Sequence, residues 1–142
     1  MSSSEYKIYF LLQRAAHLLK KNADRLLVAE TGITTTQAAV LGILENNRVL
    51  PQKEIARQLQ QRESAVTTMI VRLQNADLVT KSKNKQDARA FDIQITPKGI
   101  KSANAARTAF SVINQQLDQL MNYKQASGLA DHLAAIIESF KK

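Results

Sequence analysis

Apolar residues recur every three or four positions along most of the chain, which is the spacing of helices with one buried face. The first such stretch covers residues 4–30 and is followed by Gly32, a residue type that commonly ends helices. Thr34 and Gln37 have the spacing of a capping box, which predicts the start of a second helix. Pro51 stands where proline is favoured, at the first position of a third, shorter helix.

A fourth helix is predicted for the segment RESAVTTMIVRLQNA, which begins at Arg62. Its inward face would carry Val66, Met69, Ile70 and Leu73, and its outward face Ser64, Thr68, Arg72 and Asn75. Two short stretches with strand character follow, LVTK and AFDIQI. In the second stretch, polar residues alternate with three apolar ones that are expected to pack inward: Phe91, Ile93 and Ile95.

Two further helices are predicted after the strands. Thr96 can cap the first of them and Pro97 can open it. Its apolar residues alternate in steps of three and four, as in coiled-coil seams: Ala103, Ala106, Phe110, Ile113, Leu117 and Leu120. The last helix follows Asn122 and carries a similar series: Leu129, Leu133, Ile136, Ile137 and Phe140. A seam of this kind requires another helix beside it.

The composition narrows the classes of function. The 142 residues include 20 Lys and Arg against 12 Asp and Glu, and the net charge of +8 favours nucleic acid or an anionic membrane as a partner. There is no cysteine, which excludes disulfides, thiolate metal sites and cysteine redox chemistry. The first residues lack the layout of a signal peptide, and no apolar run is long enough for a membrane span, so a cytoplasmic protein is expected. No cofactor and no metal ion are indicated.

The order helix, helix, turn, helix, β-hairpin is that of a winged helix-turn-helix lobe, and three segments resemble the MarR family of bacterial transcription regulators. They are GITTTQAAVLGIL, EIARQLQQRESAVTTMIVRLQNADLV and DARAFDIQITPKG, and the last resembles the family's wing signature. The resemblance implies one MarR-like domain over residues 1–142, with a DNA-binding lobe at 33–99 and dimerisation helices at 4–30 and 97–141. The expected fold is mainly α with a small β-hairpin wing.

The resemblance also implies a homodimer that binds double-stranded DNA at a pseudo-palindromic operator, with repression of transcription as the expected effect. Each recognition helix would enter a major groove, and each wing would reach the neighbouring minor groove. Dimer contacts are expected from the terminal helices, at Tyr6, Phe10, Phe110, Ile113, Leu117, Leu120, Leu133 and Ile137.

Two residues depart from the family's pattern. Gln60, in the turn between the two short helices, and Asp77, before the first wing strand, stand where glycine is common. Asp tolerates a left-handed backbone better than most residues, whereas Gln does not. We therefore expect a slightly altered turn at Gln60.

Base readout is expected from the outward face of the fourth helix near its amino end, where a helix in the major groove meets base edges: Arg62, Ser64, Ala65 and Thr68. Because Ser, Thr and Ala are small, close fit, thymine methyl contacts and water would contribute to specificity. Arg72, farther along the same face, is assigned to a phosphate. The alternative interpretation is that this polar face simply meets water.

The stretch between the two strands is strongly basic. Lys81, Lys83, Lys85 and Arg89 against Asp87 leave a net charge of +3 (four minus one). A charge run is usually a solvated loop, but this density also suits phosphate contacts by the lysines. Because arginine is favoured in narrow minor grooves, we predict that Arg89 inserts there and that Asp87 orients it or another arginine.

Control by a small molecule is the least constrained expectation. Many relatives bind anionic or phenolic compounds in a crevice between the dimer helices and the DNA-binding lobe. On the first helix, Tyr9, Arg14 and His17 could supply an aromatic wall and positive donors to such an effector. The same three residues could instead only pack and meet solvent.

Three other classes of function remain as alternatives. An enzyme would need a catalytic constellation, but His17 and His132 lie on opposite terminal helices with no carboxylate pattern beside them. A winged-helix module that acts on another regulator without DNA would not require a basic wing with Arg89. A membrane-surface helix would join a basic face to an apolar face, whereas the basic cluster here lies on a loop.

Overall fold

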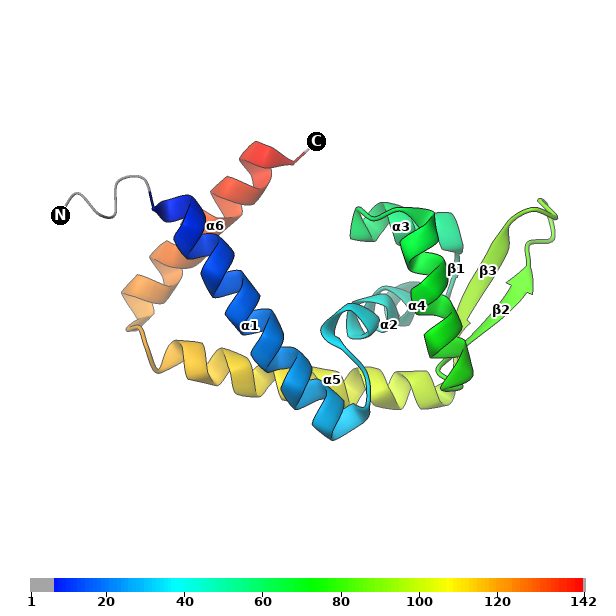
Figure 1. Ribbon diagram of the computed structural model, residues 1–142, viewed down its shortest axis with the longest axis horizontal. Coiled ribbons are helices and arrows are strands. Elements are labelled where there is room, and N and C mark those ends of the chain that lie inside the picture. Colours follow the sequence, from blue (N-terminus) through cyan, green and yellow to red (C-terminus); the bar gives the residue numbers. More distant parts are fainter. Residues whose placement is uncertain (1–6, 142) are drawn as a thin grey trace. The chain divides into compact units, whose positions relative to one another are not determined.

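The computed structural model describes residues 7–141, which form six helices and three short strands (Figure 1). The backbone divides into two compact units, one that extends to Ala109 and one that begins at Phe110. The helix α5 (Pro97–Asp118) runs from the first unit into the second.

The first unit begins with α1 (Ile8–Thr31), which ends at Gly32 as predicted. Gly32 has the left-handed conformation (φ 78°), and its N–H donates to the carbonyl of Val28 at 3.0 Å. The predicted start at residue 4 lies outside the described residues. Ala23 and Leu27 are buried, whereas the earlier part of the predicted apolar stripe is largely exposed.

Helix α2 (Thr35–Asn47) opens with the predicted capping box. The Thr34 hydroxyl accepts from the Gln37 N–H at 3.3 Å, and the Gln37 side chain accepts from the Thr34 N–H at 2.9 Å. Asp24 of α1 provides a third bond, because its carboxylate accepts from the Thr35 N–H at 2.6 Å. These bonds satisfy amide groups that a helix start otherwise leaves unpaired, and one of them ties α2 to α1.

Two short helices follow, α3 (Gln52–Leu59) and α4 (Glu63–Asn75). The predicted inward face of α4 is confirmed, since Val66, Ile70 and Leu73 are fully buried and Met69 is partly buried. They share a core with side chains from α2 and α3: Val40, Leu41, Leu44 and Ile55.

The expected distortion of the turn between α3 and α4 is not seen. Gln60 adopts the left-handed conformation that glycine favours, with φ 55° and ψ 44°. Its N–H donates to the Arg57 carbonyl at 3.1 Å, and the Gln61 N–H donates to the Ala56 carbonyl at 3.0 Å. These bonds close the end of α3 and hold a residue type that rarely takes this conformation. The backbone of Asp77 is also left-handed (φ 61°), in agreement with the tolerance of Asp for this conformation.

The strands β1 (Val49–Pro51), β2 (Val79–Lys83) and β3 (Phe91–Ile95) form an antiparallel sheet in the order β1-β3-β2. Strand β1 was not predicted, because three residues are too few to show an alternating pattern. Pro51 is tolerated there since β1 is an edge strand.

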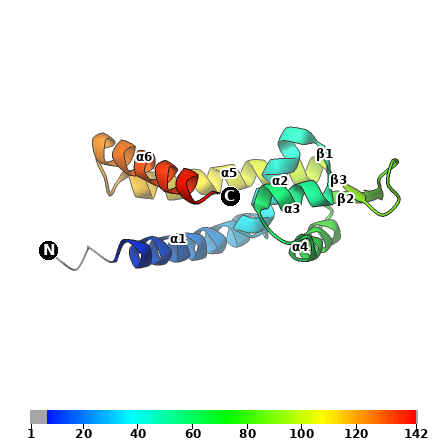
Figure 2. The same ribbon diagram turned by 90° about the horizontal axis from the view of Figure 1, so that it is seen from above.

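The hairpin of β2 and β3 projects beyond the short helices (Figure 2). Ile93 and Ile95, near its base, are buried as predicted. The prediction that Phe91 packs inward is wrong, because this residue lies farther along the hairpin and is 36% exposed. Its ring instead makes a cation–π contact with the Lys81 ammonium, which lies 4.3 Å from the ring centroid.

Thr96 caps α5 as predicted, since its hydroxyl oxygen accepts from the Gly99 N–H at 3.0 Å. The same hydroxyl donates to the Asp77 carbonyl at 2.7 Å. Gly99 is buried so tightly that a Cβ atom would lie 2.2 Å from the Leu78 carbonyl oxygen. Farther along, Arg107 forms a forked ion pair with Glu45 of α2, and one of its two bonds measures 3.1 Å.

The second unit contains the end of α5 and the helix α6 (Tyr123–Phe140). Asn122 and Gln125 form a capping box at the start of α6, with bonds of 2.8 and 3.0 Å. Helix α5 ends at Asp118, so Leu120 lies beyond it and does not continue its seam. No described residue of α6 is buried, and Ile137 is 66% exposed.

Among the described residues, no single helix is long and apolar enough to cross a membrane. Helices α1 and α2 pass that test of length and composition only as a pair bent by 70°. In α2, the apolar residues Val40, Leu41 and Leu44 are fully buried inside the first unit.

We predict that Gly99→Ala lowers the free energy of unfolding by about 3 kcal/mol, because the backbone at Leu78 cannot move aside for a methyl group. The matched control is Gly42→Ala in α2, where a methyl group meets no atom within 4 Å. This control should stabilise the protein by about 1 kcal/mol, since alanine favours a helix over glycine. Urea unfolding curves measure both changes. Equal stabilities of the two variants would contradict the packing at Gly99.

We predict that Asp24→Ala costs about 1 kcal/mol at neutral pH through loss of its bond to the α2 amino end. Partial burial raises the pKa of Asp24, but the hydrogen bonds from Thr35 and Lys20 outweigh it and hold the pKa below the ordinary 3.8. The contribution is therefore complete above pH 3.8 and is lost as pH falls through the lowered pKa. Unfolding measured against pH tests this, with exposed Glu30→Ala as the control.

Candidate nucleic-acid interface

The amino end of α4 gathers the residues predicted to read bases. Arg62 is the N-cap residue with an extended backbone, and Ser64 and Ala65 lie in the first turn. Thr68 lies one turn later, and all four side chains are exposed. Small polar side chains thus occupy the outward face of the helix end, with an arginine at its tip.

Arg72 is exposed in the last turn of α4. It lies ten residues after Arg62, which corresponds to about 15 Å along the helix axis. The two arginines therefore lie at opposite ends of α4. Such a separation suits contacts with different parts of an extended polyanion.

Asn84 organises the tip of the hairpin, a role that the sequence analysis missed. Its side-chain oxygen accepts from the N–H groups of Gln86 at 2.8 Å and Asp87 at 3.1 Å. Its side-chain nitrogen donates to the Asp92 carboxylate at 2.9 Å. An asparagine that follows a strand can form such a turn with its own backbone, and that signal was available in the sequence.

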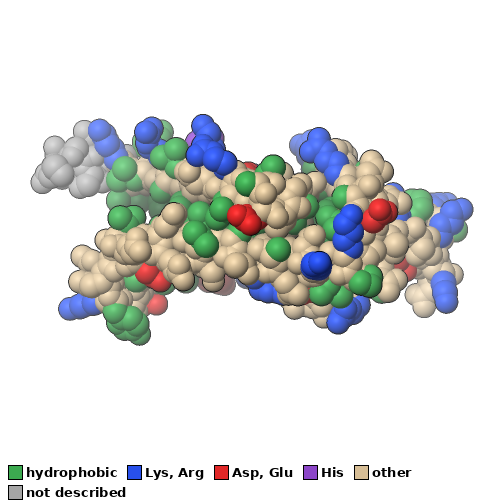
Figure 3. Space-filling view, turned by 90° about the horizontal axis from the view of Figure 1, so that it is seen from below, with side chains coloured by type: hydrophobic (Ala, Val, Ile, Leu, Met, Phe, Trp, Pro, Cys, Tyr) green, Lys and Arg blue, Asp and Glu red, His purple; other side chains and the backbone are tan. Residues whose placement is uncertain are grey.

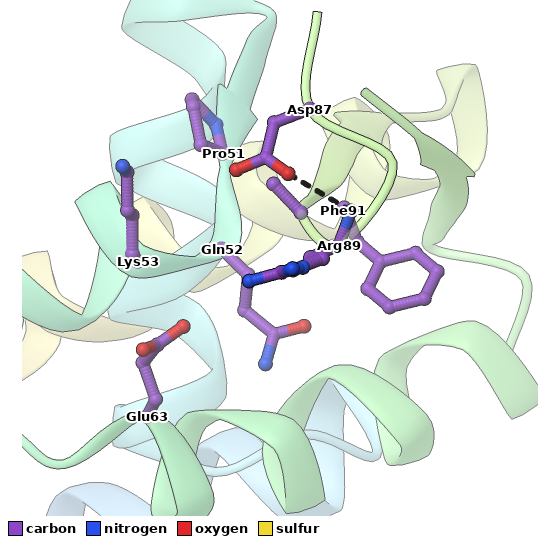
Figure 4. A pocket seen from close by; sticks show the side chains of 8 residues that line it. Pro51, Gln52, Lys53, Glu63, Asp87, Arg89 and Phe91 are labelled. Atoms are coloured by element: carbon purple, nitrogen blue, oxygen red, sulfur yellow. Dashed lines mark hydrogen bonds between the residues drawn. The ribbon is translucent and has the colours of Figure 1, made fainter. Parts of the chain in front are cut away.

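Asp87 contacts Arg89, but through the backbone. Its carboxylate accepts from the Arg89 N–H at 3.0 Å, and its carbonyl accepts from the Ala90 N–H at 3.0 Å (Figure 4). Within residues 7–141 no ion pair joins the Asp87 carboxylate to the Arg89 guanidinium. Asp87 thus fixes where the Arg89 side chain leaves the hairpin and leaves the guanidinium able to turn.

An open cavity of about 210 Å³ lies between the hairpin and the amino ends of α3 and α4. Its walls are formed by Pro51, Gln52, Lys53, Glu63, Asp87, Arg89, Ala90 and Phe91. Figure 4 shows the Arg89 side chain running into this cavity, which Gln52 also lines. The side chain predicted for the minor groove therefore folds back toward the helices here.

Lys and Arg side chains lie at the hairpin end of the first unit as well as on other parts of the visible surface (Figure 3). Lys83 and Lys85 are exposed and, with Asn84, line a second open hollow of about 350 Å³. Neither lysine forms an ion pair with another described residue. The hairpin therefore presents unneutralised positive charge to its surroundings.

Helix α3 contributes less positive charge than its sequence suggests. Arg57 is exposed but donates to the Glu54 carboxylate at 2.9 and 3.1 Å. This bond, with a second from Gln58, lowers the pKa of Glu54 to about 2, and the Glu54 carboxylate raises the pKa of Arg57. The pair stays ionised and largely neutralises itself.

The three residues predicted to bind an effector all lie on α1 and are exposed: Tyr9, Arg14 and His17. The Tyr9 ring packs edge-on against Phe10, with 5.3 Å between centroids. None of the three lines either cavity at the hairpin. Their positions on one helix do not by themselves form a binding site.

The predicted dimer contacts are apolar side chains on α1, α5 and α6. Phe10 is 66% exposed and Leu133 is 37% exposed, whereas Phe110, Ile113 and Leu117 are partly buried. Tyr6 lies outside the described residues. Exposure of so much apolar surface on the terminal helices is unusual for an isolated chain.

The short helices α3 and α4, the turn at Gln60 and the hairpin after α4 define a winged helix-turn-helix domain. A sequence profile described as the MarR family matches residues 33–91, which span this domain. Over these residues the chain matches the MarR family, a family of transcriptional regulators.

The relatives of this chain agree with that assignment. It is 35% identical over 68 residues to the HTH-type transcriptional repressor MdtR of Bacillus subtilis (strain 168). This match covers 48% of the chain and 44% of the repressor, so it spans less than half of the repressor's length.

Two solved structures extend the likeness to the whole fold. The chain is 25% identical to MepR of S. aureus in a MepR-DNA complex, with a TM-score of 0.83 and coverage of 95% and 99% of the two chains. It is 19% identical to Sco3205, a MarR family regulator from Streptomyces coelicolor solved in complex with DNA. There the TM-score is 0.87, and the coverage is 100% of this chain and 91% of the other.

Proposed function

We propose that this protein is a cytoplasmic transcriptional repressor that binds a pseudo-palindromic operator in double-stranded DNA as a homodimer. The observation that carries the proposal is the pairing, within one lobe, of an exposed α4 amino end with a basic hairpin whose Lys83 and Lys85 form no ion pair with another described residue. MdtR is named a repressor, and MepR and Sco3205 were solved with DNA, which supports the same role here.

In this proposal α4 lies in the major groove. Ser64, Ala65 and Thr68 reach base edges through short contacts, methyl groups and water, and Arg62 reaches farther from the helix start. Arg72 binds a phosphate at the far end of the helix. Readout would then depend on close approach of the helix, because three of these four side chains are short.

The hairpin supplies the second contact. Lys83 and Lys85 neutralise phosphates, and Asp87 holds the backbone from which Arg89 extends into the adjacent minor groove. Release of counterions from the DNA by these cations drives binding and makes it sensitive to salt. A role that involves only another protein would leave this charge without a purpose.

The terminal helices form the dimer. The region 33–99 acts as the DNA-binding lobe, and the segments 4–30 and 97–141 bring two lobes together. The exposed apolar residues of α6 support this, since no described residue of that helix is buried in the chain itself. A small anionic or phenolic effector bound near Tyr9, Arg14 and His17 would act by changing the separation of the lobes.

A second candidate function is that of a winged-helix module that acts on another regulator without DNA. Nothing in the charge distribution favours it over DNA binding. Catalysis has no support either, because His132 is exposed and bonded to the Gly128 carbonyl at 2.7 Å.

We predict that Arg89→Ala weakens operator binding by about 1–3 kcal/mol. Lys83→Ala should weaken binding to all sequences alike and reduce the slope of log affinity against log salt by about 0.9. Substitution of Ser64 or Thr68 should instead change which sequence is preferred. Selection of bound sequences from random DNA, followed by titrations at several salt concentrations, measures all three effects.

The matched control for these titrations is Lys124→Ala, which removes one exposed charge from α6. It should leave affinity and salt slope unchanged. Failure to enrich any motif from random DNA would favour the protein-binding module. Unaltered affinity of Arg89→Ala at physiological salt would remove Arg89 from the interface.

We predict that Phe110→Glu or Leu117→Glu converts the dimer to a monomer and abolishes operator binding, because a buried charge at an apolar seam is unpaired. Sedimentation at micromolar concentration measures the mass. Gln115→Glu, at an exposed position of the same helix, is the control and should remain dimeric. A monomeric wild-type protein would overturn the dimer proposal.

A further inference from the structure

Gln52 stands out among the described residues as the buried polar side chain of the first unit. It is the first residue of α3 and is 8% exposed. Buried amides normally have partners for both their donor and their acceptor. The contacts of Gln52 satisfy only one of them.

The donor of Gln52 is fixed to the recognition helix. Its Nε2 donates to the Thr67 hydroxyl at 2.6 Å. That hydroxyl in turn donates to the Glu63 carbonyl one turn earlier in α4, at 2.9 Å. The short relay from Gln52 through Thr67 to Glu63 sets the orientation of the Gln52 amide.

The acceptor of Gln52 is unpaired. Its Oε1 is buried and has no hydrogen-bond partner among the described residues. Gln52 lines the cavity between the hairpin and the amino ends of α3 and α4, and so does Arg89. An unpaired buried acceptor beside a cavity requires a donor from within that cavity.

Arg89 is the donor best placed for this acceptor. Its side chain runs into the cavity that Gln52 lines, whereas Lys53 turns away in Figure 4. The carboxylate side chains of Glu63 and Asp87 offer only acceptor atoms. No hydrogen bond or ion pair joins the Arg89 guanidinium to another described side chain. Since the Asp87 carboxylate holds only the Arg89 backbone, the side-chain torsions of Arg89 can deliver an N–H to Gln52.

We propose that Gln52 Oε1 retains the Arg89 guanidinium in the cavity when the protein is free of DNA. Gln52 is then a positioning residue that couples the hairpin arginine to the recognition helix through Thr67. On the proposed function, Arg89 must leave Gln52 before it enters a minor groove. Gln52 therefore holds back the hairpin contact and weakens DNA binding.

The first test uses the full-length protein without DNA. The Arg89 Nε–H signal, assigned by its loss in Arg89→Lys, should show slow hydrogen exchange in nitrogen-edited NMR spectra. Gln52→Leu has a similar shape and leaves the Thr67 hydroxyl bonded to Glu63, so it should fold. In this variant the exchange should become roughly tenfold faster. Gln58→Leu, an exposed change in the same helix, is the control and should not alter the signal.

Gln52→Glu provides a second variant in the same experiment. A carboxylate strengthens the bond to the guanidinium, so the Arg89 exchange should become slower than in the wild type. Unchanged exchange in both variants would mean that water satisfies Gln52, and the proposal would fall. Because no DNA is present, this outcome is independent of whether the protein binds an operator.

The second test measures affinity for the duplex selected by the wild-type protein. Gln52→Leu should tighten binding about tenfold and Gln52→Glu should weaken it about tenfold. Both effects should vanish in an Arg89→Ala background, because the guanidinium that Gln52 retains is then absent. Effects that persist there would show that Gln52 acts on α4 alone. A wild type that binds no DNA would defeat the proposed function, while the NMR comparison would still decide the retention of Arg89.

Discussion

The hydroxyl of Thr96 makes the hydrogen bonds on which the arrangement of the winged helix-turn-helix lobe depends. It donates to the Asp77 carbonyl, just after α4, and accepts from the Gly99 amide at the start of α5. The Thr96 N–H donates to the Leu78 carbonyl at 3.1 Å, so one residue joins the end of α4, the base of the hairpin and α5. Position 99 requires glycine, because a Cβ atom there would lie 2.2 Å from the Leu78 carbonyl oxygen. The hairpin therefore leaves the lobe in a direction set by α4.

Local signals in the sequence were sufficient to predict most of the helices. Capping residues such as Thr34, the periodic burial of α4 and the stop at Gly32 depend on neighbours within a few positions, and each was predicted correctly. Strand β1 could not be predicted, because three residues are too few to show an alternating pattern. Its pairing with β3 joins segments that lie far apart in the sequence. Phe91 was misplaced because alternation shows which face a residue lies on but not how far the hairpin extends beyond the core.

The candidate site was predictable to the level of residues but not of contacts. Sequence placed Ser64, Thr68 and Arg89 on exposed elements, and they are exposed. Neither the inward course of the Arg89 side chain nor the unpaired oxygen of Gln52 has a sequence signature, because both arise where the hairpin meets two helix ends. Composition identifies the charges of a surface, whereas tertiary structure decides which of them are neutralised, as Glu54 does for Arg57.

The hairpin tip contains no glycine, and its turns are closed by the side chains of Asn84 and Asp87. A glycine tip would sample many conformations and would lose that freedom on contact with a partner. Here most of the ordering has taken place during folding. The tip therefore meets a partner with its backbone already ordered. The entropic cost of ordering the loop on binding is then small, and it lowers the affinity little.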